Sequence, residues 1–282
     1  MASRRASSST GRFRPPRARC SPADWRALRL PSKSSHKGDN GRLLILAGSS
    51  QYSGSLILAA LAAVRFCDLI YVHSTDENLA LVSRLKRASP NLIVVRKNKL
   101  AEFWRKADAF LLGPGWEDNR ANRALLARAI SSQMPVVLDA TALRMLKPNQ
   151  IRANLLLTPH AGEFKALFGE KATARSVFHA AKKSGCTLLC KGPADFIASP
   201  ARFKTNSTHH VGMTKGGTGD VLAGLCAALA ADHNDLFSSA CAAAYLNGMA
   251  GLRLSKKMGA HYSSLDLASE LPRTAHLIEC GR

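Results

Sequence analysis

The sequence predicts an α/β protein built as a three-layer α/β/α sandwich around a mostly parallel sheet. From residue 43 onward, short apolar runs alternate with longer segments of helical periodicity, which is the pattern of a doubly wound sheet. Most of these runs are apolar throughout, as expected of parallel strands that helices cover on both faces. Most of them also lead into glycine-containing loops. Ligands bind at such loops, beyond the carboxyl ends of the strands.

Seven short apolar runs are the expected strands, and helical segments lie between and after them. The expected strands cover residues 43–46, 69–72, 92–95, 110–112, 136–138, 155–157 and 188–189. The expected helices cover residues 55–65, 78–87, 119–132, 162–168, 173–184, 220–231 and 236–254. The chain after Thr218 is therefore almost wholly helical.

The length of 282 residues and the apolar fraction of 46% are sufficient for one large core. No repeat and no linker interrupts residues 36–271, so we expect a single domain at residues 22–282. Residues 1–21 are rich in arginine and serine and lack the apolar stretch of a secretory signal. We expect a disordered basic tail there. A transit peptide or a wrongly chosen start codon explains this composition equally well.

The formal net charge is +21, and the first twenty residues hold six arginines and no acidic residue. Most of the excess therefore lies in the rest of the chain, where it favours polyanions, acidic membranes or phosphorylated substrates. Aromatic residues make up only 6% of the chain. Since no RNA-binding signature is present either, we expect no specific nucleic-acid partner. A non-catalytic polyanion-binding protein remains the competing interpretation.

The seven cysteines are scattered without a CxxC pair, which indicates free thiols in a reducing, cytoplasmic compartment. Cys186 and Cys190 are expected to be core thiols, because no nearby histidine completes a metal site. The longest uncharged segment, residues 236–252, contains serine, asparagine and glycine. We expect it to be a buried helix, and we expect no membrane span.

The segment MTKGGTGDVLAG at 213–224 places three glycines and a carboxylate directly before an apolar stretch. Glycine is costly there unless the backbone needs it. We therefore expect residues 216–219 to form an anion hole whose N–H groups converge at a helix start. A carboxylate at an anion-binding helix start would normally repel phosphate. Its presence is explained if it accepts the proton of a hydroxyl that attacks phosphorus, so Asp220 is the candidate catalytic base. The alternative is an aspartate that only complements the helix dipole.

Three other loops have both a structural and a functional interpretation. In LLLTPHAGE at 155–163, either Thr158 caps a helix whose first turn contains Glu163, or His160 contacts a ligand and Glu163 orders water or Mg²⁺. The GPG segment at 113–115 is a tight turn or admits a ligand close to the backbone. Lys191 either contacts a phosphate or is a solvated charge.

Six segments, taken in order, resemble the ADP/ATP-dependent NAD(P)H-hydrate dehydratases of the ribokinase-like superfamily. They are HKGDNGR at 36–42, GSSQYSGS at 48–55, GPG at 113–115, LTPHAGE at 157–163, CKG at 190–192 and GGTGDVLAG at 216–224. The glycine–aspartate motif alone indicates the superfamily. The HKGxxG and TPHxGE segments narrow the resemblance to the dehydratases. It covers roughly residues 22–275.

The resemblance implies repair of damaged nicotinamide cofactors. The expected reaction is dehydration of the S epimer of hydrated NADH and NADPH, called NADHX and NADPHX, at the expense of ADP. A phosphoryl group passes to the hydroxyl of the hydrated ring and then leaves as phosphate, so that AMP and phosphate are released. The implied cofactor is Mg²⁺, with ADP or ATP as co-substrate. The alternative within the superfamily is a kinase of a vitamin-precursor alcohol.

The resemblance also implies roles for individual residues. The expected substrate-binding residues are Ser55, Gly115, His160 and Asp220, of which Asp220 is catalytic. The expected nucleotide-binding residues are Lys191, Gly192, Pro193, Ala194, Asp195 and Gly219. The expected anion hole consists of Gly216, Gly217, Thr218 and Gly219, and the candidate metal ligand is Glu163.

Two positions depart from the family pattern. Thr141 stands where an aspartate is frequent, and Asp195 stands where threonine is common. These departures leave the choice between ADP and ATP open. The epimerase domain of bifunctional relatives has no counterpart here, so a separate epimerase is an expected partner. The other expected partners are the NAD(P)H hydrate, ADP and further copies of this chain in a homo-oligomer.

Overall fold

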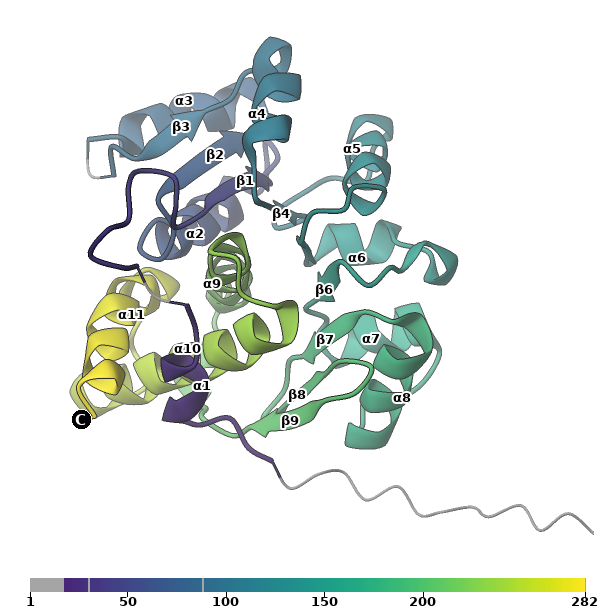
Figure 1. Ribbon diagram of the computed structural model, residues 1–282, viewed down its shortest axis with the longest axis vertical. Coiled ribbons are helices and arrows are strands. Elements are labelled where there is room, and N and C mark those ends of the chain that lie inside the picture. The colour runs from purple at the N-terminus through teal and green to yellow at the C-terminus, as the bar shows by residue number, and fades with distance from the viewer. Residues whose placement is uncertain (1–17, 30, 88, 282) are drawn as a thin grey trace, which may run out of the picture.

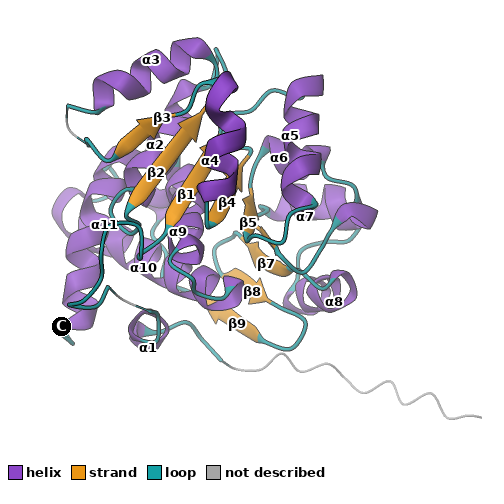
Figure 2. Ribbon diagram, turned by 45° about the horizontal axis from the view of Figure 1, so that its top comes forward, coloured by secondary structure: helices purple, strands orange, loops and turns teal. Residues whose placement is uncertain are grey.

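The computed structural model describes residues 18–29, 31–87 and 89–281. Its centre is a nine-stranded sheet in the order β3-β2-β1-β4-β5-β6-β7-β8-β9, with helices on both faces (Figures 1 and 2). The strands from β3 to β7 in this order pair in parallel. The hairpin of β8 and β9 extends one edge in antiparallel pairing. The predicted three-layer sandwich with a mostly parallel sheet is confirmed.

All seven predicted strands are present, and each of their ends lies within one residue of the prediction. The strands are β1 (Arg42–Leu46), β2 (Leu69–His73), β3 (Leu92–Val94), β4 (Ala109–Leu112), β5 (Val136–Leu138), β6 (Leu155–Leu157), β7 (Thr187–Cys190), β8 (Asp195–Ala198) and β9 (Phe203–Asn206). The last two were not predicted. Strand β9 lies at the sheet edge, and its lysine, threonine and asparagine leave it without a continuous apolar run. Strand β8 lies between β7 and β9, and its apolar run of three residues follows Asp195.

The seven predicted helices correspond to α2, α3, α5, α7, α8, α9 and α10. The helices are α1 (Pro22–Arg26), α2 (Ser53–Ala63), α3 (Asp76–Leu85), α4 (Leu100–Lys106), α5 (Arg120–Ile130), α6 (Thr141–Met145), α7 (Ala161–Phe168), α8 (Ala174–Ser184), α9 (Thr218–Ala231), α10 (Leu236–Met258) and α11 (Ser264–Glu279). Helix α11 was not predicted. It contains Pro272 in its interior, and proline normally ends a helical pattern.

Successive residues of each strand point to opposite faces of the sheet and build two cores. Leu43 and Ile45 of β1 belong to the core with α2, α9, α10 and α11, whereas Leu44 and Leu46 belong to the core with α5, α6 and α7. In the first core, α9 crosses α2 closely, because a Cβ at Gly224 would lie 2.2 Å from the Ala59 carbonyl oxygen.

The cysteines and the long apolar helix fit the predicted interior. All seven cysteines are free thiols, and Cys186 and Cys190 are buried as predicted. Burial raises the pKa of both thiols to about 12. Across the described parts of the chain, no helix combines the length and apolar character needed to cross a membrane.

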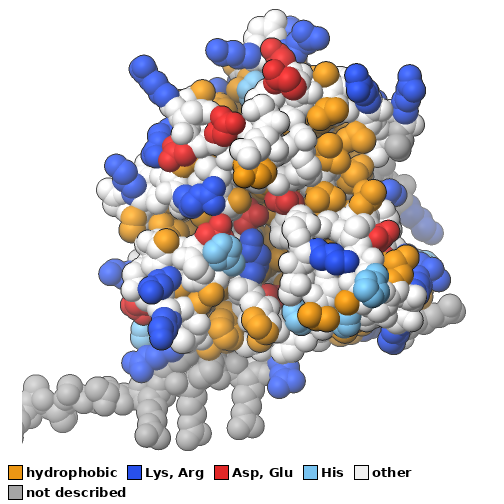
Figure 3. Space-filling model, turned by 180° about the vertical axis from the view of Figure 1, so that it is seen from behind, with side chains coloured by type: hydrophobic (Ala, Val, Ile, Leu, Met, Phe, Trp, Pro, Cys, Tyr) orange, Lys and Arg blue, Asp and Glu red, His pale blue; other side chains and the backbone are white. Residues whose placement is uncertain are grey.

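The described chain begins beside the sheet edge. The Cys20 N–H donates to the Thr205 carbonyl (2.8 Å), and the Thr205 N–H donates to the Ala18 carbonyl (3.0 Å). Residues 1–17 of the predicted tail lie outside the described residues. On the face shown in Figure 3, basic side chains are spread over the surface, and acidic, basic and histidine side chains gather around a central hollow.

Candidate active site

The candidate site lies at the carboxyl edge of the sheet, where the loops after β1, β4, β5, β6 and β7 meet. The Gly48 N–H donates to the Pro114 carbonyl (2.7 Å) and joins the first two of these loops. Gly113 has φ of +113°, and a Cβ there would lie 2.0 Å from the Asp139 carbonyl oxygen. Glycine is therefore required for the close packing that brings side chains from several strands together.

Gly115 brings the loop after β4 against the start of α2. Its φ is +66°, and a Cβ there would lie 2.4 Å from the Tyr52 carbonyl oxygen and 3.1 Å from the Ser55 Cβ. The predicted substrate residues Ser55 and Gly115 are consequently neighbours. The Ser55 side chain also lies close enough to Asp220 to lower the pKa of that carboxyl group, which places three of the four predicted substrate residues together.

The glycine loop before α9 is tightly braced. Gly217 caps the helix with φ of +92°, and a Cβ there would lie 2.3 Å from the Leu58 side chain. The Thr218 hydroxyl donates to the carbonyls of Met213 (2.7 Å) and Lys215 (3.0 Å). This hydroxyl therefore holds the loop in shape and is not directed at a ligand.

The backbone donors of the same loop are open. Among the described residues, the N–H groups of Gly216, Gly217, Gly219 and Asp220 have no hydrogen-bond acceptor. They belong to the start of a fourteen-residue helix, where the helix dipole adds positive potential. The arrangement is suited to holding an anion.

Asp220 lies in the first turn of α9 and is half-buried. Its pKa is raised to about 6, mainly because burial disfavours the charged form and also because the Asp139 carboxylate repels it. The nearby Ser55 side chain and the Lys191 charge lower the pKa. At neutral pH the carboxylate is still ionised, and it is a stronger base than an ordinary aspartate. It can accept a proton from a hydroxyl brought to the open N–H groups.

Lys191 and Asp139 form an ion pair at the ends of β7 and β5. The Lys191 Nζ lies 2.7 Å from the Asp139 Oδ1, which also accepts a hydrogen bond from the Thr158 hydroxyl (2.9 Å). Burial by itself lowers the pKa of Lys191, but the Asp139 carboxylate raises it above its usual value. The ammonium group therefore stays charged. It lies beside the anion loop, since a Cβ at Gly219 would be 3.4 Å from Nζ.

His160, and not Thr158, caps helix α7, so the capping interpretation was wrong by two residues. The His160 Nδ1 accepts hydrogen bonds from the N–H groups of Gly162 (3.0 Å) and Glu163 (3.2 Å). Since Nδ1 accepts, the ring hydrogen resides on Nε2. Nε2 lies 3.6 Å from the Glu163 Oε2, and the His160 side chain is 62% exposed, so a ligand at the mouth of the site can reach the ring.

Glu163 completes the capping box and retains one open oxygen. Its Oε2 accepts a hydrogen bond from the His160 N–H (3.0 Å), and its Oε1 accepts none from a described residue. The described residues contain no cluster of three or more side chains suited to holding a metal. A Mg²⁺ ion would therefore have to take several of its oxygen ligands from a bound nucleotide or water.

The predicted nucleotide segment forms the turn between β7 and β8. The Asp195 carboxylate accepts hydrogen bonds from the Gly192 N–H (3.1 Å) and from the Asn206 side chain (2.9 Å). Burial raises the pKa of this carboxyl group. Asp195 therefore braces the hairpin internally, while Gly192 and Pro193 are exposed on the turn.

Two polar residues of the site, Asp139 and Arg144, received no role in the sequence analysis. A charged residue directly after a buried strand is the signal that would have identified Asp139. Its partner Lys191 is 52 positions away, so the pair was not legible from the sequence. Arg144 follows Thr141, whose hydroxyl donates to the Trp116 carbonyl (2.8 Å) and accepts a hydrogen bond from the Arg144 guanidinium.

The overall fold is that of a known class of protein. The structure resembles the crystal structure of a ribokinase-like superfamily protein from Enterococcus faecalis, with a TM-score of 0.84 and 22% identity over 93% of this chain and 96% of that chain. The predicted ribokinase-like fold is thereby confirmed.

The sequence comparison assigns the chain to one family within this class. The NAD(P)H-hydrate dehydratase family model matches residues 43–273, and the chain belongs to that family, as predicted. It is 36% identical to the ADP-dependent (S)-NAD(P)H-hydrate dehydratase of Cenarchaeum symbiosum, over 86% of this chain and 92% of that protein. It also resembles the crystal structure of an ADP/ATP-dependent NAD(P)H-hydrate dehydratase from Bacillus subtilis with ATP/Mg²⁺, with a TM-score of 0.81 and 25% identity over 93% of this chain and 99% of that chain.

Several relatives are much longer than this chain. It spans about half the length of the bifunctional NAD(P)H-hydrate repair enzymes that it matches, including that of Methanocaldococcus jannaschii. The identity to that enzyme is 35% over 269 residues, which cover 91% of this chain and 52% of the relative.

Proposed function

We propose that this protein dehydrates the S epimer of NADHX and NADPHX to NADH and NADPH at the expense of ADP, giving AMP and phosphate. Family membership supports the proposal, as does the named activity of the Cenarchaeum symbiosum relative. One observation carries the chemistry. The Asp220 carboxylate, with its pKa raised to about 6, shares the first turn of α9 with open N–H groups and lies beside the Ser55 side chain. A proton acceptor and an anion site thus lie in one helix turn.

The first step transfers a phosphoryl group to the hydroxyl of the hydrated ring. Asp220 takes the proton of the hydroxyl while the hydroxyl oxygen bonds to the terminal phosphorus of ADP. The bond from that phosphorus to the bridging oxygen breaks, which releases AMP. The N–H groups of Gly216, Gly217 and Gly219 stabilise the charge on the transferring phosphoryl group. Phosphate then leaves with the C–O electron pair, and loss of a proton from the neighbouring carbon restores the double bond.

The charges around the anion loop suit a nucleoside diphosphate. Lys191 stays protonated because of Asp139, and we assign it to the phosphates of ADP. The turn that follows provides the remaining nucleotide contacts in this proposal, from Gly192, Pro193, Ala194 and Asp195. Ser55, Gly115 and His160 border the hydrated nicotinamide ring.

The metal in this proposal is Mg²⁺ bound together with the nucleotide. Glu163 supplies an open oxygen, Oε1, and the phosphates of ADP supply others. When bound, Mg²⁺ neutralises phosphate charge. The crystal structure of the Bacillus subtilis relative, which was co-crystallised with ATP/Mg²⁺, supports Mg²⁺ as the ion that accompanies the nucleotide.

The proposal extends to partners and location. A separate epimerase converts the R epimer to the S epimer, an idea that the bifunctional relatives support. We place the enzyme in the cytoplasm, because its seven cysteines are free thiols, and we propose that it forms a homo-oligomer. The alternative, a vitamin-precursor kinase, requires a stable phosphorylated product, and the family match favours the dehydratase.

The test is recovery of the absorbance of the reduced nicotinamide ring. Purified protein is incubated with hydrated NADH or NADPH, Mg²⁺ and either ADP or ATP. We expect recovery with ADP that stops when the S epimer is consumed, together with AMP and phosphate. Failure to recover absorbance with either nucleotide contradicts the proposal. A phosphorylated product that accumulates without recovery, detected by mass spectrometry, supports the kinase.

A further inference from the structure

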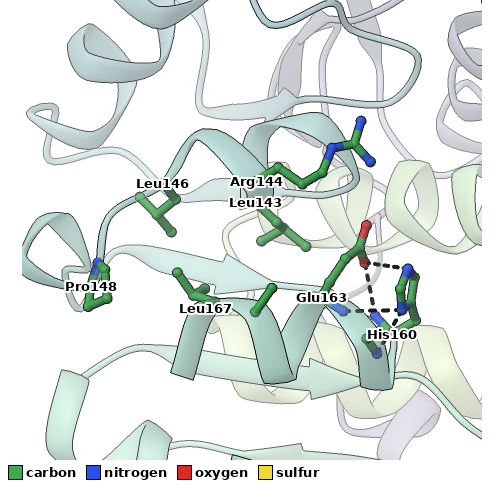
Figure 4. A pocket seen from close by; sticks show the side chains of 9 residues that line it. Leu143, Arg144, Leu146, Pro148, His160, Glu163 and Leu167 are labelled. Carbon is green, nitrogen blue, oxygen red and sulfur yellow. Dashed lines mark hydrogen bonds and ion pairs between the residues drawn. The ribbon is translucent and has the colours of Figure 1, made fainter. Parts of the chain in front are cut away.

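A second concavity opens beside His160, next to the candidate active site (Figure 4). Its volume is about 390 Å³, and α6, α7 and the segment between α6 and β6 enclose it. One part of the lining is apolar and the other is polar. The apolar part consists of Leu143, Leu146, Pro148, Ala166 and Leu167, and the polar side chains are those of Arg144, His160 and Glu163.

Arg144 brings a charge to this pocket that no acidic side chain of the described residues compensates. The hydrogen bond that its guanidinium makes within the described residues goes to the neutral hydroxyl of Thr141. No carboxylate of those residues lies within ion-pair distance of it. Glu163 lines the same pocket, but its carboxylate is linked to His160, as the dashed lines of Figure 4 show. The guanidinium thus retains N–H donors for a ligand.

We propose that Arg144 binds a phosphate group of the dinucleotide substrate. This inference rests on the proposed function, because it assigns a further part of the same substrate. The hydrated ring is only one end of a dinucleotide. The other groups, namely the pyrophosphate, the second nucleoside and, in NADPHX, the 2′-phosphate, extend beyond Asp220. His160 borders both the proposed ring site and this pocket, so the pocket is the adjoining space for them.

The chemistry of the pocket matches such a ligand. A planar guanidinium pairs with phosphate oxygens through two parallel hydrogen bonds. The apolar part of the lining suits a base or a ribose face. Arg144 is exposed, so a phosphate reaches it without displacing a buried partner. Two phosphates of the substrate share this chemistry, the pyrophosphate and the 2′-phosphate.

The test compares Arg144→Gln and Arg144→Lys with the unaltered enzyme. We expect Arg144→Gln to raise KM for the hydrate about tenfold, the effect of losing one hydrogen-bonded charge contact, with kcat and the KM for ADP unchanged. We expect a smaller increase of KM for Arg144→Lys, because lysine keeps the positive charge but cannot form two parallel hydrogen bonds. The matched control is Lys147→Gln, an exposed cation three positions away that does not line the pocket. It leaves all three constants within about twofold.

Comparison of KM for NADHX and NADPHX shows which of the two phosphates Arg144 contacts. An increase of KM for NADPHX alone assigns Arg144 to the 2′-phosphate, and an equal increase for NADHX and NADPHX assigns it to the pyrophosphate. Unchanged KM for both hydrates, an increase for ADP alone, or an equal effect of Lys147→Gln overturns the inference.

These outcomes differ from failure of the proposed function. An unaltered enzyme that recovers no cofactor contradicts the proposed function. In that case calorimetric titration of NADPHX into the unaltered protein and into Arg144→Gln still tests this inference, and equal dissociation constants overturn it.

Discussion

Two glycine-rich segments lie at opposite edges of the sheet, and their backbone groups are used differently. At the amino ends of the strands, the Asp68 carboxylate accepts hydrogen bonds from the N–H groups of Gly38 (2.7 Å) and Asn40 (3.2 Å). Gly41 has φ of +93°, and a Cβ there would lie 2.6 Å from the Ala231 carbonyl carbon. This segment anchors β1 to the end of α9, and glycine serves packing.

At the carboxyl ends of the strands, the loop before α9 leaves backbone donors open. The N–H groups of Gly216, Gly217 and Gly219 have no acceptor among the described residues. A Cβ at Gly216 would have nothing within 4 Å, so packing does not explain that glycine. The comparison teaches that N–H groups bonded to Asp68 belong to a structural motif and that the open N–H groups before α9 belong to the candidate site, although both segments contribute to the resemblance to the family.

The largest effect expected at the carboxyl edge comes from Asp220→Asn. The amide cannot take the proton of the attacking hydroxyl, so we expect kcat to fall about a thousandfold, measured by recovery of reduced-cofactor absorbance. The affinity for ADP should change little. The matched control at the other edge is Asp39→Asn, which should leave kcat within about twofold. A comparable loss in both variants would erase the functional distinction between the edges.

At the amino edge of the sheet, substitution of a glycine is expected to lower the stability of the protein. Gly41→Ala places a Cβ against backbone atoms and forces a left-handed conformation on alanine, so the free energy of unfolding should fall by about 3 kcal/mol. Urea unfolding measures this loss. The matched control, Gly216→Ala, should cost less than about 0.5 kcal/mol, because its Cβ meets open space. Equal losses would show that both glycines serve packing.

A smaller effect is expected on the pH dependence of stability. Asp220 has a raised pKa of about 6 in the folded protein against 3.8 ordinarily, so ionising it disfavours the folded state. This penalty is absent below pH 3.8, grows as the pH rises toward 6, and is constant above that. Asp220→Asn should therefore stabilise the protein by about 3 kcal/mol at pH 7.5 and by almost nothing near pH 3. Thermal or urea unfolding at both pH values measures the difference, and a gain independent of pH would contradict the assigned cause.

The sequence predicted features that depend on neighbouring residues. Continuous apolar runs predicted the parallel strands, and the glycines before Asp220 predicted its place in the first turn of a helix. Pairing between distant residues was not predictable. The Lys191–Asp139 ion pair joins the ends of two strands, and only the strand order brings them together. The use of His160 as a cap was also missed, because caps are usually serine, threonine, aspartate or asparagine.

The central claim is that Asp220 accepts the proton of the attacking hydroxyl. The most direct measurement is the rate of AMP formation in single turnovers of ADP and the S hydrate, quenched over a series of pH values. We predict a rate that is constant above neutrality and falls about tenfold per pH unit below an apparent pKa near 6, with no such titration in Asp220→Asn. A rate independent of pH between 5 and 8, or the same titration in Asp220→Asn, would contradict the claim.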